Sequence, residues 1–231
     1  MRFLFDLWQP IDYILWIGSM LIYGIITLAV GGTDIGYLIS IMIGITALIY
    51  TAKGHIFGPL LMVIFSILYS LISLSFQYHS EFITYGFMTL PMSILAALAW
   101  FKHPSKQLKN QVQVRHLDLK GWMFGILLTT MVTIIFGTIM VWLNTKNIIV
   151  STLSISSSFM AVYLTFVRSR YYAISYAIND FVLVVLWAYA YTVEPEYLPL
   201  IVCFVLFFIY DIYGFISWSI ITKNQFSSKP F

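Results

Sequence analysis

The stretch GWMFGILLTTMVTIIFGTIMVWL, residues 121–143, contains no charged side chain and decides the class of fold. A helix of about 20 apolar residues spans the hydrocarbon core of a bilayer, and this run is long enough to do so. The run does not alternate between apolar and polar residues, as a strand of a membrane β-barrel would. The sequence therefore predicts a membrane-spanning α-helix here.

Apolar runs of similar length lie on both sides of this one. Together the runs occupy residues 12–30, 35–52, 57–77, 82–101, 121–143, 148–167, 171–191 and 196–221. The composition agrees, because 61% of the 231 residues are hydrophobic and only 9% are charged, whereas about a quarter of the residues in a soluble domain are charged. We therefore expect an all-α polytopic membrane protein with about eight transmembrane helices.

Basic residues are divided unequally between the two ends of the predicted helices. One end holds Arg2, Lys53, Lys102, Lys106, Lys109, Arg115, Lys120, Arg168, Arg170, Lys223 and Lys229. The other end holds Lys146 and the acidic residues assigned to its loops, Asp34, Glu81, Glu194 and Glu196. Because loops rich in Lys and Arg stay on the cytoplasmic side, we expect both termini in the cytoplasm.

The two halves of the chain resemble each other. Shifted by 118 positions, Trp218 aligns with Trp100, and Trp187 aligns with Tyr69. This similarity predicts two parallel three-helix repeats joined by one helix, a 3+1+3 arrangement with an extra N-terminal helix, as in some small-solute transporters. The expected boundaries are 1–34 for the added helix, 35–103 for the first repeat, 104–147 for the loop and linker helix, 148–222 for the second repeat and 223–231 for the tail.

Two carboxylates, Asp180 and Asp211, fall well inside predicted spans. A charge at the centre of a membrane helix costs about 2.5–3.5 kcal/mol on insertion scales, so such residues face the bundle interior and mark substrate or ion pathways. Helical spacing places further aromatic and amide side chains on or beside the same faces: Tyr172, Tyr176, Asn179 and Trp187 in the seventh span, and Tyr210 and Tyr213 in the eighth. This combination suits a flat heterocycle that carries hydroxyl groups. A purely structural role for the two Asp residues stays open.

Other aromatic and small residues have ordinary structural interpretations. We interpret Trp100, Trp218, Tyr191 and Tyr197 as members of the aromatic belts at the membrane interfaces. The pairs Gly54/Gly58 and Gly121/Gly125 have the four-residue spacing that predicts close packing between helices. With Cys203 as its one cysteine, the chain forms no internal disulfide and no cysteine metal site.

Enzyme classes find no support in the motifs. The sequence lacks a Gly-rich phosphate loop, a His-Glu-x-x-His pair and a Gly-x-Ser-x-Gly turn, and Asp180 lacks the Gly-x-Gly-Asp context of an intramembrane protease. We expect no catalytic residues, no metal, no cofactor and no nucleic-acid partner. Because the span interiors contain no Lys or Arg, which usually bind phosphate, an unphosphorylated nucleoside is favoured over a nucleotide.

Several motifs resemble those of the Pnu family of bacterial vitamin transporters. They lie within residues 35–222 and are Thr51-Ala52-Lys53-Gly54, Thr89-Leu90-Pro91-Met92-Ser93, Ala97-Leu98-Ala99-Trp100-Phe101-Lys102-His103, Asn179-Asp180 with Trp187, and Tyr210-Asp211-Ile212-Tyr213-Gly214-Phe215-Ile216-Ser217-Trp218. The resemblance implies a homotrimer in the bacterial cytoplasmic membrane that facilitates vitamin-precursor uptake, with the substrate trapped inside by cytosolic phosphorylation.

The two carboxylates favour a cationic family substrate, nicotinamide riboside or thiamine, over neutral riboflavin or deoxynucleosides. We expect an alternating-access carrier that binds nicotinamide riboside at mid-membrane. The expected substrate-binding residues are Asn179, Asp180, Trp187, Tyr176, Tyr172, Asp211, Tyr210, Tyr213, Tyr69 and Ser93. Three alternatives remain: uptake of thiamine, riboflavin or a deoxynucleoside; an ion-coupled carrier in which Asp180 or Asp211 titrates; and a non-transporting membrane subunit or intramembrane enzyme.

Overall fold

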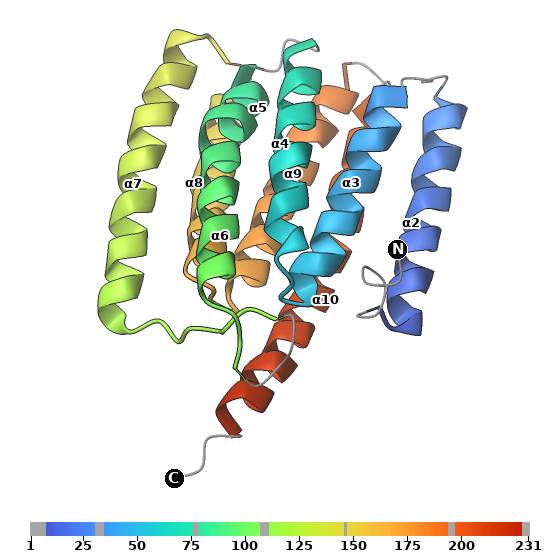
Figure 1. The fold of residues 1–231 in the computed structure, drawn as a ribbon. Helices are drawn as coiled ribbons and strands as arrows, with labels where there is room; N and C mark the ends of the chain where they lie inside the picture. Colours follow the sequence, from blue (N-terminus) through green and yellow to red (C-terminus); the bar gives the residue numbers. More distant parts are fainter. Residues whose placement is uncertain are drawn as a thin grey trace.

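The computed structural model describes residues 8–30, 35–75, 79–106, 111–145, 147–193 and 197–227, most of which are helical. The elements are α2 (Pro10–Ala29), α3 (Ile35–Ala52), α4 (Phe57–Ser75), α5 (His79–Ile83), the π-helix η1 (Thr84–Thr89), α6 (Leu90–Lys102), α7 (Leu119–Trp142), α8 (Ile148–Phe166), α9 (Tyr172–Tyr191) and α10 (Leu198–Ser227). They form one bundle, beyond which the end of α10 projects (Figure 1).

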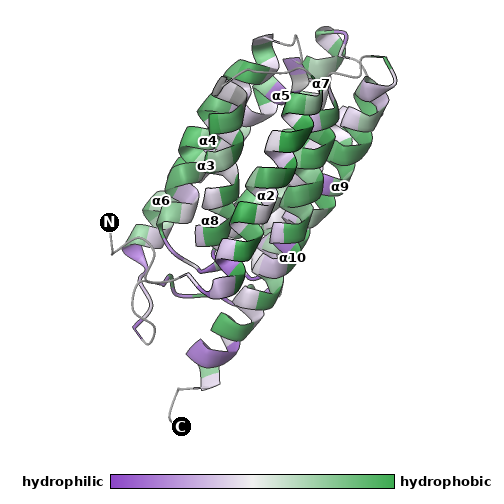
Figure 2. Cartoon of the chain, turned by 90° about the vertical axis from the view of Figure 1, so that its right-hand side faces the viewer, coloured by the Kyte–Doolittle hydropathy of each residue, from purple (hydrophilic) through white to green (hydrophobic). Residues whose placement is uncertain are grey.

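The lengths and compositions of these helices match a membrane protein. Seven described segments are long and apolar enough to cross a bilayer, with α5, η1 and α6 acting as one span over Glu81–Lys102. The helix α3 lies beside them and has a shorter apolar stretch, Leu38–Ala52. Hydrophobic residues predominate along the helices (Figure 2). Many large apolar side chains, among them Leu28, Phe87 and Ile134, are exposed on the outside of the bundle, where lipid replaces water as the solvent. The predicted all-α polytopic fold is confirmed.

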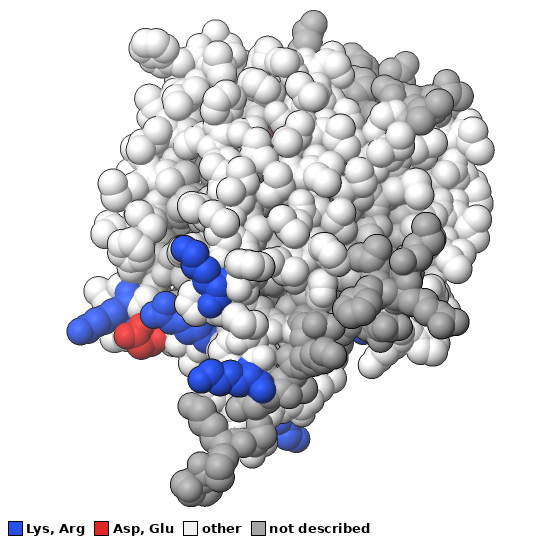
Figure 3. All heavy atoms as spheres, viewed as in Figure 1, with Lys and Arg blue, Asp and Glu red and all other residues white. Residues whose placement is uncertain are grey.

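One end of the bundle, here called the basic end, gathers the described cations. It carries Lys53, Lys102, Lys106, Arg115, Lys120, Arg168, Arg170 and Lys223, several of which are visible in Figure 3. The other predicted loop charges, including Lys146, Asp34, Glu194 and Glu196, lie outside the described residues. The prediction for Glu81 is wrong, because its side chain is buried against the neighbouring helices and does not extend from a loop.

The two halves of the bundle repeat the same turn. Gly54, after α3, and Arg168, after α8, both have a positive φ, 66° and 62°. The amide of each donates to a threonine carbonyl three residues earlier, Thr51 at 2.9 Å and Thr165 at 3.0 Å. Glycine tolerates this backbone, whereas arginine adopts it at a cost. A strained conformation kept in both halves supports the internal duplication.

A reciprocal pair of tryptophans joins the halves. The Trp100 indole, from α6, donates to the carbonyl oxygen of Thr165 at the end of α8, at 2.9 Å. The Trp218 indole, from α10, donates to the carbonyl oxygen of Thr51 at the end of α3, at 2.7 Å. Both rings are buried, and their centroids lie 5.5 Å apart. The belt interpretation of these two residues is therefore wrong, because each closes the last turn of a helix in the other half.

The π-helical segment η1 has a cause in the sequence. Pro91 has no amide hydrogen, and its ring would clash with the carbonyl of the residue four positions earlier in a regular α-helix. The wider turn of η1 ends just before this proline, and π-turns of this kind are frequent at functional sites. Gly86 allows the close approach to α4, since a Cβ there would lie 2.8 Å from the Ser70 hydroxyl.

The predicted small-residue contacts are partly correct. A Cβ on Gly125 would overlap the ring of Tyr163 on α8, and one on Gly58 would lie 2.6 Å from the backbone nitrogen of Thr51 on α3. These two glycines let neighbouring helices pack closely. Gly54 serves instead the positive-φ turn, and the carbonyl of Gly121 accepts a hydrogen bond from the Tyr163 hydroxyl at 2.8 Å.

Replacing Gly58 with alanine is expected to destabilise the bundle by about 1–3 kcal/mol, the usual effect of forcing extra atoms into packed helices. The added methyl group would meet backbone, which cannot rotate away. Gly18→Ala on α2 is the matched control, since nothing lies within 4 Å of its Cβ position. Thermal unfolding of both variants in detergent measures the difference, and equal midpoints would contradict the close α3–α4 contact.

The added helix α2 is fastened to both halves by polar contacts. Asp12 forms an ion pair with Lys53 at 2.8 Å, and the Tyr213 hydroxyl donates to its other oxygen at 2.7 Å. The Lys53 ammonium also donates to the Tyr213 hydroxyl at 2.9 Å. Burial lowers the pKa of the nearby His55, in the turn after α3. The Asp12–Lys53–Tyr213 cluster thus joins α2 to the end of α3 and to α10.

Removing one partner of this ion pair is expected to harm the fold more than removing both. Lys53→Met leaves a fully buried carboxylate without its cation, which typically costs about 3–5 kcal/mol. The double variant Asp12→Leu/Lys53→Met should recover most of that loss, because two apolar side chains replace two desolvated charges. Unfolding of both single variants and the double variant gives the coupling energy. Additive effects would show that the pair does not act as a unit.

Candidate functional site

Asp180 of α9 and Asp211 of α10 meet inside the bundle. Their side chains are only 2% and 3% exposed, and their carboxyl groups lie within hydrogen-bonding distance of each other. A carboxylate can only accept, so a hydrogen bond between two carboxyl groups requires a proton on one of them. No donor among the described residues reaches Oδ2 of Asp180. The pair is thus a buried acidic centre.

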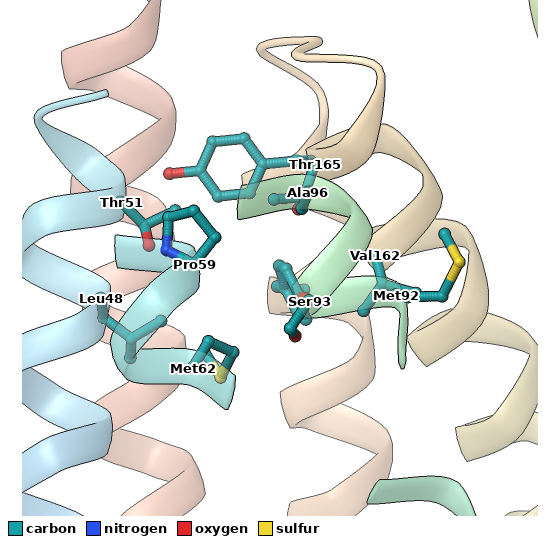
Figure 4. Close-up of a pocket in the computed structure, with 11 residues that line it drawn as sticks. Leu48, Thr51, Pro59, Met62, Met92, Ser93, Ala96, Val162 and Thr165 are labelled. Carbon is teal, nitrogen blue, oxygen red and sulfur yellow. The ribbon is translucent and has the colours of Figure 1, made fainter. Parts of the chain in front are cut away.

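Tyr172, Tyr176 and Ser93 lie on the basic-end side of this pair. Both tyrosines interact electrostatically with Asp211. All three line a cavity of about 20 Å³ between α3, α4, α6, α8 and α9, together with Leu48, Thr51, Pro59, Met62, Met92, Ala96, Val162 and Thr165 (Figure 4). A single water molecule needs roughly 10–15 Å³. The cavity therefore holds about one water, and a heterocycle can enter it only if helices move apart.

An aromatic cluster occupies the opposite side of the carboxyl pair. It consists of Phe65, Tyr69, Tyr85, Phe204 and Phe207, supplied by α4, η1 and α10. The Tyr69 and Tyr85 centroids are 4.4 Å apart, and Phe65 stacks on Tyr69 at 5.5 Å. The Tyr85 hydroxyl interacts electrostatically with Asp180. Aromatic rings thus flank the carboxyl pair on both sides, since Trp218 packs on Tyr172 at 4.9 Å towards the basic end.

Other expected site residues have different neighbours. Asn179 accepts a hydrogen bond from Ser157 of α8 at 3.0 Å, beside an open groove between α7, α8 and α9. Tyr210 shares a 3.2 Å hydrogen bond with Ser19 of α2, and Tyr213 belongs to the Asp12–Lys53–Tyr213 cluster. The Trp187 ring lies 5.5 Å from Tyr197, towards the end opposite the basic one. The structure therefore gathers Asp180, Asp211, Tyr172, Tyr176 and Ser93 closely, with Tyr69 farther out.

Glu81 and Tyr85 are buried residues near this centre that the sequence analysis does not identify. They lie four positions apart near the start of one span, so helical spacing places them on one face, and this was the available signal. Both are buried and interact electrostatically with each other. Among the described residues, no group of three or more His, Cys, Asp or Glu side chains could hold a metal ion.

Comparisons with known proteins agree with this architecture. A family model described as "Nicotinamide mononucleotide transporter" matches residues 34–220. A nicotinamide riboside transporter, PnuC, of Neisseria mucosa is 23% identical over 189 residues, which are 79% of this chain and 71% of the relative. A crystal structure described as that of the vitamin B3 transporter PnuC has the same fold, with a TM-score of 0.81 over 94% of each chain at 19% identity.

The family match covers both halves of the bundle and both buried carboxylates. The relatives are transporters and not enzymes, in agreement with the motifs that the sequence lacks. The resemblance to the Pnu family is thereby confirmed, and the chain belongs to the nicotinamide mononucleotide transporter family of multi-pass membrane proteins.

Proposed function

We propose that the protein is a facilitative carrier for nicotinamide riboside, a nucleoside whose pyridinium ring carries a positive charge. The observation that carries this proposal is the buried Asp180–Asp211 pair, which has aromatic rings on both sides. Carboxylates attract the cation, rings stack on its flat base, and acceptors bind hydroxyl groups. The name of the Neisseria mucosa relative supports the same substrate.

The description of the family names the mononucleotide, which differs from the riboside by a negatively charged phosphate group. A phosphate group is usually bound by Arg, Lys or a helix N-terminus. The described Lys and Arg side chains lie at the basic end, and Lys53, the buried one, is paired with Asp12. A phosphate near Asp180 and Asp211 would meet like charge. The unphosphorylated nucleoside is therefore the better substrate.

Transport by alternating access would use the two aromatic layers as gates. Trp100, Trp218 and Tyr172 would close the path towards the basic end. The aromatic cluster of Phe65, Tyr69, Tyr85, Phe204 and Phe207 would close it on the other side. The two units, residues 35–103 and 148–222, would rock against each other around the carboxyl pair. From the positive-inside rule we expect the basic end and both termini in the cytoplasm of a bacterium, where phosphorylation would trap the substrate. As in the resemblance, we expect a homotrimer.

A proton-coupled carrier is the second candidate, favoured by the contact between the two carboxyl groups, since a hydrogen bond between them requires a proton on one of them. An arriving cation would release this proton, so that one positive charge replaces another. Uptake would then respond to a pH gradient, whereas facilitated uptake needs only a substrate gradient.

Uptake of radiolabelled nicotinamide riboside into liposomes containing the purified protein tests the proposal. We expect uptake without any ion gradient, saturation with concentration, and competition by unlabelled riboside but weakly by the mononucleotide. Empty liposomes are the control, and thiamine and riboflavin test the alternative substrates. Uptake that requires a pH gradient would favour the second candidate. Binding of riboflavin or the mononucleotide in preference to the riboside would contradict the assignment.

A further inference from the structure

Glu81 is a buried acidic residue that forms no ion pair with the Lys and Arg side chains that the structure describes. Its side chain is 1% exposed, and its Oε2 atom has no hydrogen-bond partner among the residues described. It lies in α5, at one end of the bundle. The described Lys and Arg side chains gather at the other end, the basic end. Burying an ionised carboxylate without a cation is expensive, and ionisable residues inside membrane proteins commonly mark ion or substrate pathways.

The neighbouring π-helix η1 contains two further buried polar groups, the hydroxyls of Thr84 and Thr89. In the α-helices, Thr51 and Thr165 donate their hydroxyls to the carbonyl four residues earlier, at 2.7 and 2.9 Å. In η1, the buried hydroxyls of Thr84 and Thr89 have no such partner in the described structure. For Thr89, the carbonyl four residues earlier belongs to Tyr85, and in the π-turn this carbonyl accepts the amide of Leu90. These hydroxyls therefore remain available to a ligand.

Tyr85 connects Glu81 with the central carboxyl pair. Its hydroxyl is close enough to interact electrostatically with both Glu81 and Asp180. Its ring lies 4.4 Å from that of Tyr69 and 5.9 Å from that of Phe65. Rings bordered by carboxylates are the surroundings in which proteins bind organic cations, because ring faces and carboxylates both carry negative potential.

We propose that Glu81, Thr84, Tyr85 and Tyr69 form a second binding station for a flat organic cation, which the substrate occupies between the Glu81 end of the bundle and the Asp180–Asp211 pair. The station selects for positive charge before the substrate reaches the centre. This inference rests on the proposed function, since it assigns the substrate's pyridinium ring to the new station.

Substrate charge provides the test. Nicotinamide riboside and its reduced dihydro form differ little in size, but only the former is a cation. Glu81→Gln keeps the shape of the side chain and removes its charge. We expect this variant to bind the cation at least tenfold more weakly than wild type and the dihydro form less than threefold more weakly. Glu81→Asp should keep most of the preference for the cation.

Equal losses for both forms, or no loss, would overturn the second station while leaving the proposed function intact. A wild-type protein that binds neither form would contradict the proposed function itself. A second measurement needs no variant. Dicyclohexylcarbodiimide reacts with carboxyl groups in apolar surroundings, and mass spectrometry locates the adduct. The cation should slow labelling of Glu81 in wild type more than the dihydro form does, whereas equal rates would count against the station.

Discussion

Replacing Asp180 with asparagine is expected to weaken binding of nicotinamide riboside by about tenfold to a hundredfold, with the fold intact. A hydrogen bond or ion pair to a charged group contributes roughly 1.5–3 kcal/mol, and each 1.4 kcal/mol is about a factor of ten in affinity. Asparagine keeps the size of the side chain and a hydrogen bond to Asp211 but removes the charge. Calorimetric titration of purified protein measures the change. Asp211→Asn should behave similarly, because the two carboxyl groups act as one centre.

Asp118→Asn is the matched control for these variants. Asp118→Asn removes one negative charge, as the other two variants do, but at the start of α7. There the Asp118 side chain accepts a hydrogen bond from the Gly121 amide at 3.0 Å. Asparagine serves equally well at a helix N-cap, so affinity and stability should both remain at the wild-type level. Undiminished affinity in both Asp180→Asn and Asp211→Asn would show that the pair is structural.

Replacing Trp218 with alanine is expected to reduce the free energy of unfolding by about 3–5 kcal/mol, as for other buried large-to-small changes. The ring is fully buried, contacts Trp100 and Tyr172, and caps the end of α3 through the carbonyl of Thr51. Because the arrangement is reciprocal, Trp100→Ala should cost a similar amount. The corresponding Phe variants remove mainly the hydrogen bond and should cost about 1–3 kcal/mol.

Trp142 provides the control for the tryptophan series. It lies at the end of α7 and is 86% exposed, so Trp142→Ala should change stability by no more than about 0.5 kcal/mol. Thermal unfolding in detergent compares the variants. A Trp218 variant as stable as the Trp142 variant would contradict the role of the tryptophan pair in joining the two halves.

The sequence predicts those features of the fold that depend on local composition. Apolar runs such as residues 121–143 determine spans by themselves, because the bilayer requires only length and hydrophobicity. The internal duplication was also visible from the alignment of Trp100 with Trp218. The sequence does not predict that Trp100 and Trp218 join the two halves, because a tryptophan near a helix end suits an interfacial belt equally well. Only the partner, a carbonyl in the other half, distinguishes the two.

The site shows the same division between local and distant information. The cost of a mid-membrane carboxylate singles out Asp180 and Asp211 as functional candidates. It does not predict that the two side chains contact each other. Glu81 was assigned to a loop because polar neighbours surround it in the sequence, whereas packing buries it. Tyr213 shares a helix with Asp211, yet its hydroxyl is engaged by Asp12, which is 201 positions away. Contacts of this kind depend on the order of the helices in space.

The location of bound substrate tests the central claim most directly. A structure of the protein with nicotinamide riboside should show the pyridinium ring between the aromatic layers, with its riboside hydroxyls or its ring next to Asp180 and Asp211, and with α6 or α9 displaced to enlarge the small cavity beside Ser93. A riboside bound in the groove between α7, α8 and α9, with the carboxyl pair still closed on itself, would contradict the account.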